Sequence, residues 1–186
     1  MATRSTVSIL TLDGKLSSIY GHSDGNVSWN GAILFEHYRD VNKVKELISF
    51  GDMSSLAPLV SPPPGVPHSF EYKDRAEGVT TFYGRDRGET GVDARQYKDF
   101  EEYKKDGDFQ EYDYVFKEKN NTWYLYSTET EKLQKLRSLL VKEQKNSPEI
   151  KEVLSRVALI ELIQKEKKQL DENISNKKEK VNKIKV

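Results

Sequence analysis

The chain contains no cysteine among its 186 residues. This absence excludes disulfide bonds, thiol catalysis and zinc sites built on thiolates. The first residues, MATRSTVSIL, also lack the basic and apolar segments of a secretory signal peptide. Both observations are typical of proteins that stay in the reducing cytoplasm, so we expect a cytoplasmic location.

Long hydrophobic runs and an excess of one charge sign are also missing. The longest apolar runs, at residues 32–35 and 157–160, are far shorter than the roughly 20 residues that cross a bilayer. Lysine and arginine total 30, as do aspartate and glutamate, so the formal net charge is zero. Proteins that bind nucleic acid over a broad surface usually carry a basic excess. We therefore expect neither a membrane protein nor a general nucleic-acid binder.

Aromatic residues, glycine and histidine are absent after about residue 128. The preceding part contains all of them, and such a composition can bury a mixed core. The following part consists mainly of Lys, Glu, Leu, Ile, Val, Gln and Asn at helical spacing. The sequence therefore predicts an α+β domain over residues 1–127 and a helical C-terminal arm over residues 128–186.

Two hairpins frame the predicted domain. Asp13-Gly14 separates two strand-like runs and predicts a type I′ turn, which needs positive φ at both central residues. A second hairpin is predicted over residues 112–126. Two helices over residues 30–48 and a strand over residues 79–83 lie between the hairpins. This order predicts an antiparallel sheet with helices packed on one face.

The predicted arm begins with a helix over residues 129–145, and a second helix starts after a break at residues 146–149. From Ile160 onward, apolar residues recur at a spacing of three and four, as in a coiled-coil seam with polar interruptions. The long helix is expected to pack on the domain, to form a homodimer through residues 149–184, or to remain free. Lysines predominate from Lys165, so nucleic-acid binding by this stretch is a weaker alternative.

The segment YGHSDG follows a predicted strand and contains Tyr20, His22 and Asp24. A histidine and a carboxylate two positions apart can form an acid/base pair or share a metal. The same residues suit a polar turn, in which the glycines take unusual φ values and Asp24 caps backbone N–H groups. No HExxH or comparable motif is present. The polar turn is therefore favoured, and no metal or cofactor is expected.

The segment YGRDRGE contains Tyr83, Arg85, Asp86, Arg87 and Glu89. If the preceding strand continued, Arg85 and Arg87 would project to the same side, because side chains alternate along a strand. Two guanidinium groups on one side can hold a phosphate or a carboxylate. They can equally form internal ion pairs that hold the two loops together, or present an interaction surface. The segment lacks the GK[ST] of a P-loop.

Three stretches occur in the order TRSTVSILTLDGKLSSIYGHSDG, GAILFEHYRDVNKVKELISFGDMSSL and TTFYGRDRGETGVDA. Their SIYxHxDG, HYxD, GDxSSL and YGRDRGE segments resemble a family of small, largely uncharacterised proteins of tailed bacteriophages and bacteria. The resemblance covers roughly residues 1–126. The family pattern carries tryptophan between the histidine and the aspartate and Tyr-Pro after the glycine, where this chain has Ser23 and Asn26-Val27. If that tryptophan belongs to a binding pocket, the pocket is altered here.

The resemblance implies a phage-associated setting in the host cytoplasm, where small accessory proteins commonly bind one host protein. The leading hypothesis is therefore a non-catalytic host-takeover or counter-defence protein whose partner is a host protein. The alternative is a nucleotide- or phosphate-binding protein, or a hydrolase, that uses the two loops. The candidate binding residues are Tyr20, His22, Asp24, Trp29, Tyr83, Arg85, Asp86, Arg87 and Glu89.

Overall fold

A sheet of eight strands forms the centre of the computed structural model, which describes residues 2–145 and 147–184. Neighbouring strands follow the order β4-β3-β2-β1-β6-β7-β8, and β5 pairs with β2. The strands are β1 (Ser5–Leu10), β2 (Leu16–Gly21), β3 (Met53–Ser55), β4 (Thr81–Phe82), β5 (Arg95–Tyr97), β6 (Tyr112–Lys117), β7 (Thr122–Ser127) and β8 (Lys132–Lys135). With the helices described below, this sheet confirms the expected α+β class.

The strand directions differ from the all-antiparallel sheet that the hairpins predicted. β1 runs parallel to β6, with Ser5 opposite Tyr112 and Leu10 opposite Lys117, and β2 is parallel to β3. The expectation was wrong because a hairpin turn reports only on strands that are adjacent in the sequence. The parallel pairing of β1 with β6 joins the two hairpins from opposite ends of the domain into one mixed sheet.

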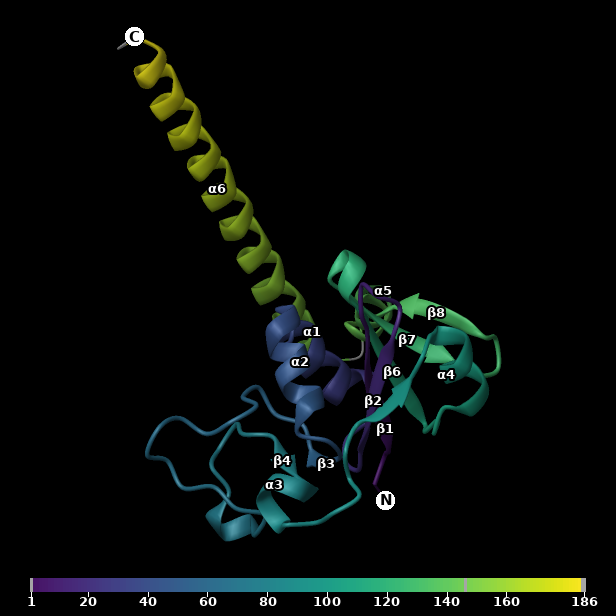
Figure 1. Ribbon diagram of the computed structural model, residues 1–186. Helices are drawn as coiled ribbons and strands as arrows, with labels where there is room; N and C mark the ends of the chain where they lie inside the picture. The colour runs from purple at the N-terminus through teal and green to yellow at the C-terminus, as the bar shows by residue number, and fades with distance from the viewer. Residues whose placement is uncertain (1, 146, 185–186) are drawn as a thin grey trace.

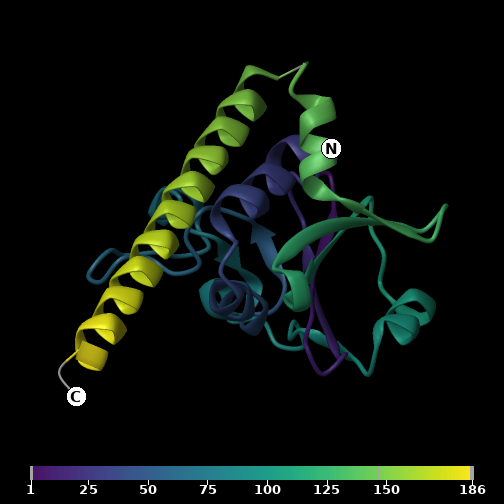
Figure 2. The same ribbon diagram turned by 90° about the horizontal axis from the view of Figure 1, so that it is seen from above.

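Helices cover both faces of the sheet, which corrects the prediction of a single helical face (Figure 1). α1, α2, α5 and the start of α6 pack on one face, and α4 packs on the other. Figure 2 shows α4 across the sheet from α6. The helical elements are a π-helix (Val27–Gly31), α1 (Ala32–His37), α2 (Val41–Ser49), two short 3-10 helices (Tyr72–Asp74 and Glu118–Asn120), α3 (Tyr83–Arg87), α4 (Phe100–Asp106), α5 (Leu136–Glu143) and α6 (Pro148–Ile184).

The larger core lies between the sheet and α1, α2 and α5. Val7 of β1 pairs with Tyr114 of β6 in this core, and both side chains are fully buried. Trp123 of β7 packs against Phe116 with ring centroids 5.1 Å apart, and its indole N–H donates to the Tyr38 carbonyl at 2.7 Å. Tyr114, Phe116 and Trp123 of the second hairpin therefore form part of the larger core.

The smaller core, on the opposite face, contains a buried polar network. Tyr103 of α4 is fully buried, and its hydroxyl lies 3.2 Å from Thr6 Oγ1. The Thr6 hydroxyl donates to Asp113 Oδ1 at 2.8 Å, and the Ser8 hydroxyl donates to Ser18 Oγ at 2.9 Å. Buried polar groups need such partners, because an unpaired one loses its hydration without compensation. The network therefore fixes how α4 sits on the sheet.

The first hairpin forms where Asp13-Gly14 predicted it, but its turn is not type I′. Of the two central residues only Gly14 has a positive φ, at +86°. The Thr11 N–H donates to the Lys15 carbonyl at 2.9 Å, and the Gly14 N–H donates to the Thr11 carbonyl at 3.0 Å. The Thr11 hydroxyl also donates to the Asp13 carboxylate at 2.5 Å. These bonds hold a longer turn in which glycine alone needs the left-handed conformation.

β8 and α5 replace the helix predicted over residues 129–145. Lys132–Lys135 pairs with β7 in antiparallel fashion, and the helix starts only at Leu136. Leu133 packs against the smaller core, whereas Leu136 and Leu140 are fully buried in the larger one. The helix prediction was wrong for residues 132–135, because a local apolar pattern does not show that a strand and a helix share the segment.

α6 starts as predicted, with the Ile150 N–H donating to the Ser147 hydroxyl at 3.4 Å. Ile150, Val153 and Val157 are buried in the larger core, and beyond them the helix extends away from the domain (Figure 1). Parts of the segment predicted as the arm, in β8, α5 and the start of α6, thus contribute side chains to the two cores. Within the described residues no helix, α6 included, combines the length and apolar character that crossing a lipid bilayer requires.

Asp113 makes the stability of this fold depend on pH. Burial raises the pKa of the Asp113 carboxyl to about 6. Hydrogen bonds from the Gln110 N–H and the Thr6 hydroxyl act in the opposite direction but are outweighed. Because this value exceeds that of the unfolded chain, the stabilising effect of protonation is complete below about pH 4 and is lost as pH rises through about 6.

We expect Asp113→Asn to remove this dependence while keeping the acceptor oxygen. Between about pH 4 and pH 7, the free energy of unfolding of the wild type should fall by roughly 2–3 kcal/mol relative to the variant. Urea denaturation at both pH values measures this difference. The exposed Asp106→Asn is the control, and an equal pH response in Asp113→Asn and the wild type would contradict the expectation.

Candidate functional site

The YGHSDG segment leaves β2 alongside β3. Gly21 pairs with Met53, and the N–H groups of His22 and Ser23 donate to the carbonyls of Met53 and Ser54 at 3.0 and 3.1 Å. A Cβ atom on Gly21 would lie 2.9 Å from Ser5 Oγ and 3.0 Å from Met53 Cε. A larger residue at this position would therefore require the Ser5 or Met53 side chain to shift.

The YGRDRGE segment lies on the other side of β3. β4 ends at Phe82, and Tyr83 begins α3 instead of continuing the strand. The predicted strand over residues 79–83 is thus shorter, because the Phe82 N–H donates to the Asp86 carboxylate at 2.7 Å and starts a helical turn. Arg85 and Arg87 therefore lie on a helical turn and do not project to the same side of a strand. The two segments are nevertheless neighbours across β3.

Tyr20, His22, Ser54 and Tyr83 form a polar cluster at this edge of the sheet. The Tyr20 hydroxyl lies 2.9 Å from His22 Nδ1, and all four side chains are partly exposed. Burial raises the pKa of Tyr83, and the nearby Tyr20 and Glu89 raise it further. A hydrogen bond with Ser54 and the charge of Arg87 act in the opposite direction. The structure thus brings together Tyr20, His22 and Tyr83 from the predicted binding residues.

Arg85 is enclosed by internal partners. Its Nε and Nη2 donate to the Asp86 carboxylate at 2.6 and 2.8 Å. Its Nη1 donates to the Val60 carbonyl at 2.7 Å, and Nη2 also donates to the Thr80 carbonyl at 2.6 Å. The guanidinium lies 4.8 Å from the centre of the Phe82 ring. A phosphate could reach this guanidinium only by displacing these bonds.

Asp86 forms a buried polar cluster with Arg85 and His68. Burial alone would raise the pKa of Asp86, but hydrogen bonds from Arg85 and the Phe82 N–H, with the charge of Arg85, lower it below its usual value. His68 Nδ1 accepts a hydrogen bond from the Ala76 N–H at 3.0 Å, which assigns the ring proton to Nε2. That nitrogen lies 3.4 Å from Asp86 Oδ2. The cluster ties the segment that precedes the 3-10 helix Tyr72–Asp74 to α3.

The remaining predicted residues are more exposed. Arg87 pairs with Glu89 at 3.1 Å, and its guanidinium lies 4.9 Å from the centre of the Phe70 ring. Asp24 is exposed and has a positive φ of +57°, which fits the polar turn. Trp29 is 57% exposed on the π-helix. Neither Asp24 nor Trp29 has a side-chain hydrogen bond to the polar cluster among the described residues.

Sequence reasoning missed Asp52, the residue that joins the elements around this site. Its carboxylate accepts two hydrogen bonds from Arg95 at 2.9 and 3.0 Å and one from the Tyr20 N–H at 2.7 Å. Its carbonyl accepts from the Tyr83 N–H at 3.0 Å. Asp52 and Arg95 lie 43 positions apart, so no local pattern links them. The Gly-Asp pair after a predicted helix was the only available signal.

The part of the chain covered by residues 2–145 and 147–184 contains no group of three acidic or histidine side chains placed to hold a metal ion. In comparisons with known proteins, no family model, no curated protein and no solved structure matches the chain. The site must therefore be interpreted from its own geometry. That geometry shows a YGHSDG loop held by backbone hydrogen bonds to β3 and a YGRDRGE loop held by the Arg85–Asp86 pair, beside a small polar cluster at the sheet edge.

The enclosure of Arg85 predicts a stability cost that Arg87 does not share. Arg85→Ala leaves the buried Asp86 carboxylate without its main partner, so we expect a loss of roughly 2–4 kcal/mol in the free energy of unfolding. Arg87→Ala removes an exposed pair and should cost less than about 1 kcal/mol. Chemical denaturation of both variants tests this difference. Equal costs would show that Arg85 is not the structural member of the pair.

Proposed function

We propose that this chain is a non-catalytic binding protein that captures another protein through the projecting part of α6. One observation carries the proposal. Apolar side chains remain exposed on this helix after it leaves the core. They are Leu159, Ile160, Leu162, Ile163, Leu170 and Ile174, each at least 39% exposed.

Their arrangement supports a contact surface rather than scattered exposure. Ile160, Ile163, Leu170 and Ile174 are three, seven and four positions apart, which places them on one stripe of the helix that Lys167 interrupts. Single exposed apolar residues are ordinary, but an aligned row of them is typical of a surface that another molecule covers. A helix that lacks tertiary contacts is also marginal by itself, so a partner would stabilise it.

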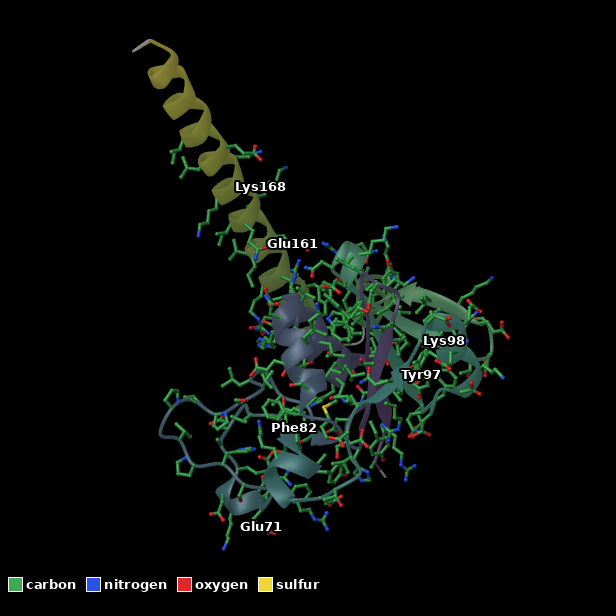
Figure 3. All side chains as sticks on the ribbon, viewed as in Figure 1. Glu71, Phe82, Tyr97, Lys98, Glu161 and Lys168 are labelled. Carbon is green, nitrogen blue, oxygen red and sulfur yellow. The ribbon has the colours of Figure 1, made fainter. Side chains whose placement is uncertain are left out.

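The direction of α6 is held at its base by ion pairs. Arg156 donates to the Glu36 carboxylate of α1 at 2.5 and 3.0 Å. Glu161 accepts from Arg39 at 2.8 Å. Figure 3 shows Glu161 near the domain and Lys168 further out on the projecting helix. A rigid base presents the stripe in one orientation, which lowers the entropic cost of binding.

The proposed partner is a host protein. The resemblance to phage proteins favours this kind of partner and a role in host takeover or counter-defence. The 3-4 spacing alone would also suit a second copy of the chain. The polar cluster of Tyr20, His22 and Tyr83 would supply a second contact surface on the domain. Among the lysines of α6 whose side chains the structure describes, no contact favours nucleic acid over protein as the partner.

We expect the double variant Ile163→Glu, Leu170→Glu to lose partner capture from host lysate by at least about tenfold, because two buried charges oppose apolar contact. Lys165→Gln, Lys168→Gln changes the charge by the same amount on the polar side of α6 and should capture normally. Quantitative mass spectrometry of the retained protein measures the capture.

Light scattering of the purified chain separates the two partners. A monomeric mass with stripe-dependent capture supports a host protein. A dimeric mass that the stripe variant reduces identifies a second copy as the partner. A monomer whose retained proteins are the same in both variants would overturn the proposal.

A further inference from the structure

Lysine interrupts the apolar stripe on the projecting part of α6 (Figure 1). Lys167 lies four positions after Ile163 and three before Leu170, and all three side chains are exposed. It therefore occupies the same face of the helix as these apolar neighbours. The sequence places a second lysine, Lys177, at a later position of the same row. A molecule that covers this stripe must also cover the Lys167 side chain.

A covered lysine ammonium group needs a carboxylate partner, because it loses hydration when an apolar surface encloses it. Arg156 and Glu161 form ion pairs with the domain, and both lie at the base of α6. Within the helix, Asp171 is the one acidic residue three or four positions from Lys167, in the lysine-first order that gives the weaker pair. The charge that balances a covered Lys167 therefore has to come mainly from the binding partner.

A second copy of the chain does not present this carboxylate from its own stripe. The row contains only apolar residues and lysine, at positions 160, 163, 167, 170, 174, 177, 181 and 184. Two such helices therefore place a lysine or an apolar side chain opposite Lys167, in either direction and in any register. In the parallel, in-register pair two copies of Lys167 face each other, and their like charges oppose pairing.

We propose that the stripe of α6 binds an amphipathic helix of another protein that carries an aspartate or glutamate opposite Lys167. This inference rests on partner capture by the stripe and defines the chemistry of the partner. An apolar row on the partner helix would cover Ile163, Leu170 and Ile174, while its carboxylate would pair with the ammonium group. Lys167 then determines specificity, because it attracts the acidic helix and repels a second copy.

A Lys167→Glu variant of the full chain supplies a defined helix of this kind. It keeps the apolar row and presents a carboxylate at the position that faces Lys167 in a parallel pair. Sedimentation equilibrium compares the wild type, the variant and their equimolar mixture. Each chain alone should stay monomeric where the mixture forms a heterodimer, with association at least about tenfold tighter than that of either homodimer. Added salt should weaken the heterodimer, because an ion pair distinguishes it from the homodimers.

Two variants control for general effects of charge. Lys165→Glu makes the same charge change on the polar side of α6, so its mixture with the wild type should associate no more than the wild type alone. Lys167→Leu removes the repulsion between copies and should form a homodimer at concentrations where the wild type is a monomer. Lys177 is common to all of these chains, so its effect cancels from the comparison.

Two results would refute an acidic partner helix. One is a wild-type chain that dimerises through the stripe, and the other is equal association in the Lys167→Glu and Lys165→Glu mixtures. Capture from lysate separates this inference from the proposed function. Capture that is lost in Ile163→Glu, Leu170→Glu but kept in Lys167→Glu contradicts the acidic partner and leaves stripe-dependent capture intact. Capture that Ile163→Glu, Leu170→Glu leaves unchanged contradicts the proposed function itself.

Discussion

The parallel pairing of β1 with β6 is the constraint on which the rest of the structure depends. It joins two hairpins from opposite ends of the domain and places Thr6 opposite Asp113. On one face the pairing brings Val7 beside Tyr114 and creates the larger core. On the other face the Thr6–Asp113 hydrogen bond provides a polar anchor for α4. Each core contains side chains from both hairpins, so neither core could form without this register.

Ion pairs lie in or beside both glycine-bounded loops, Arg85–Asp86 within the second and Asp52–Arg95 next to the first. Asp52 links β2, β5 and α3 through Tyr20, Arg95 and Tyr83. Arg85 and Asp86 link α3 to the chain before β4. A buried charge pair holds a loop firmly, because separating the charges leaves each one unpaired. The loops therefore form a rigid edge of the sheet.

Sequence patterns located most elements but could not assign their partners. Asp13-Gly14 marked a hairpin, and the break at residues 146–149 marked the start of α6. The same patterns misplaced the element boundary at Tyr83, where one side-chain bond from Asp86 changes strand into helix. Among the candidate residues, the clustering of Tyr20, His22 and Tyr83 depended on β3 lying between their segments, which no local pattern shows.

The sequence by itself determined the α+β class, the two-part composition and the apolar stripe of α6, because these follow from residue types and their spacing along one chain. Tertiary structure decided the parallel join between the hairpins, the helix on the second face, and the internal use of Arg85. These features arise from contacts between residues distant in sequence, whose pairing depends on the packing of the whole fold.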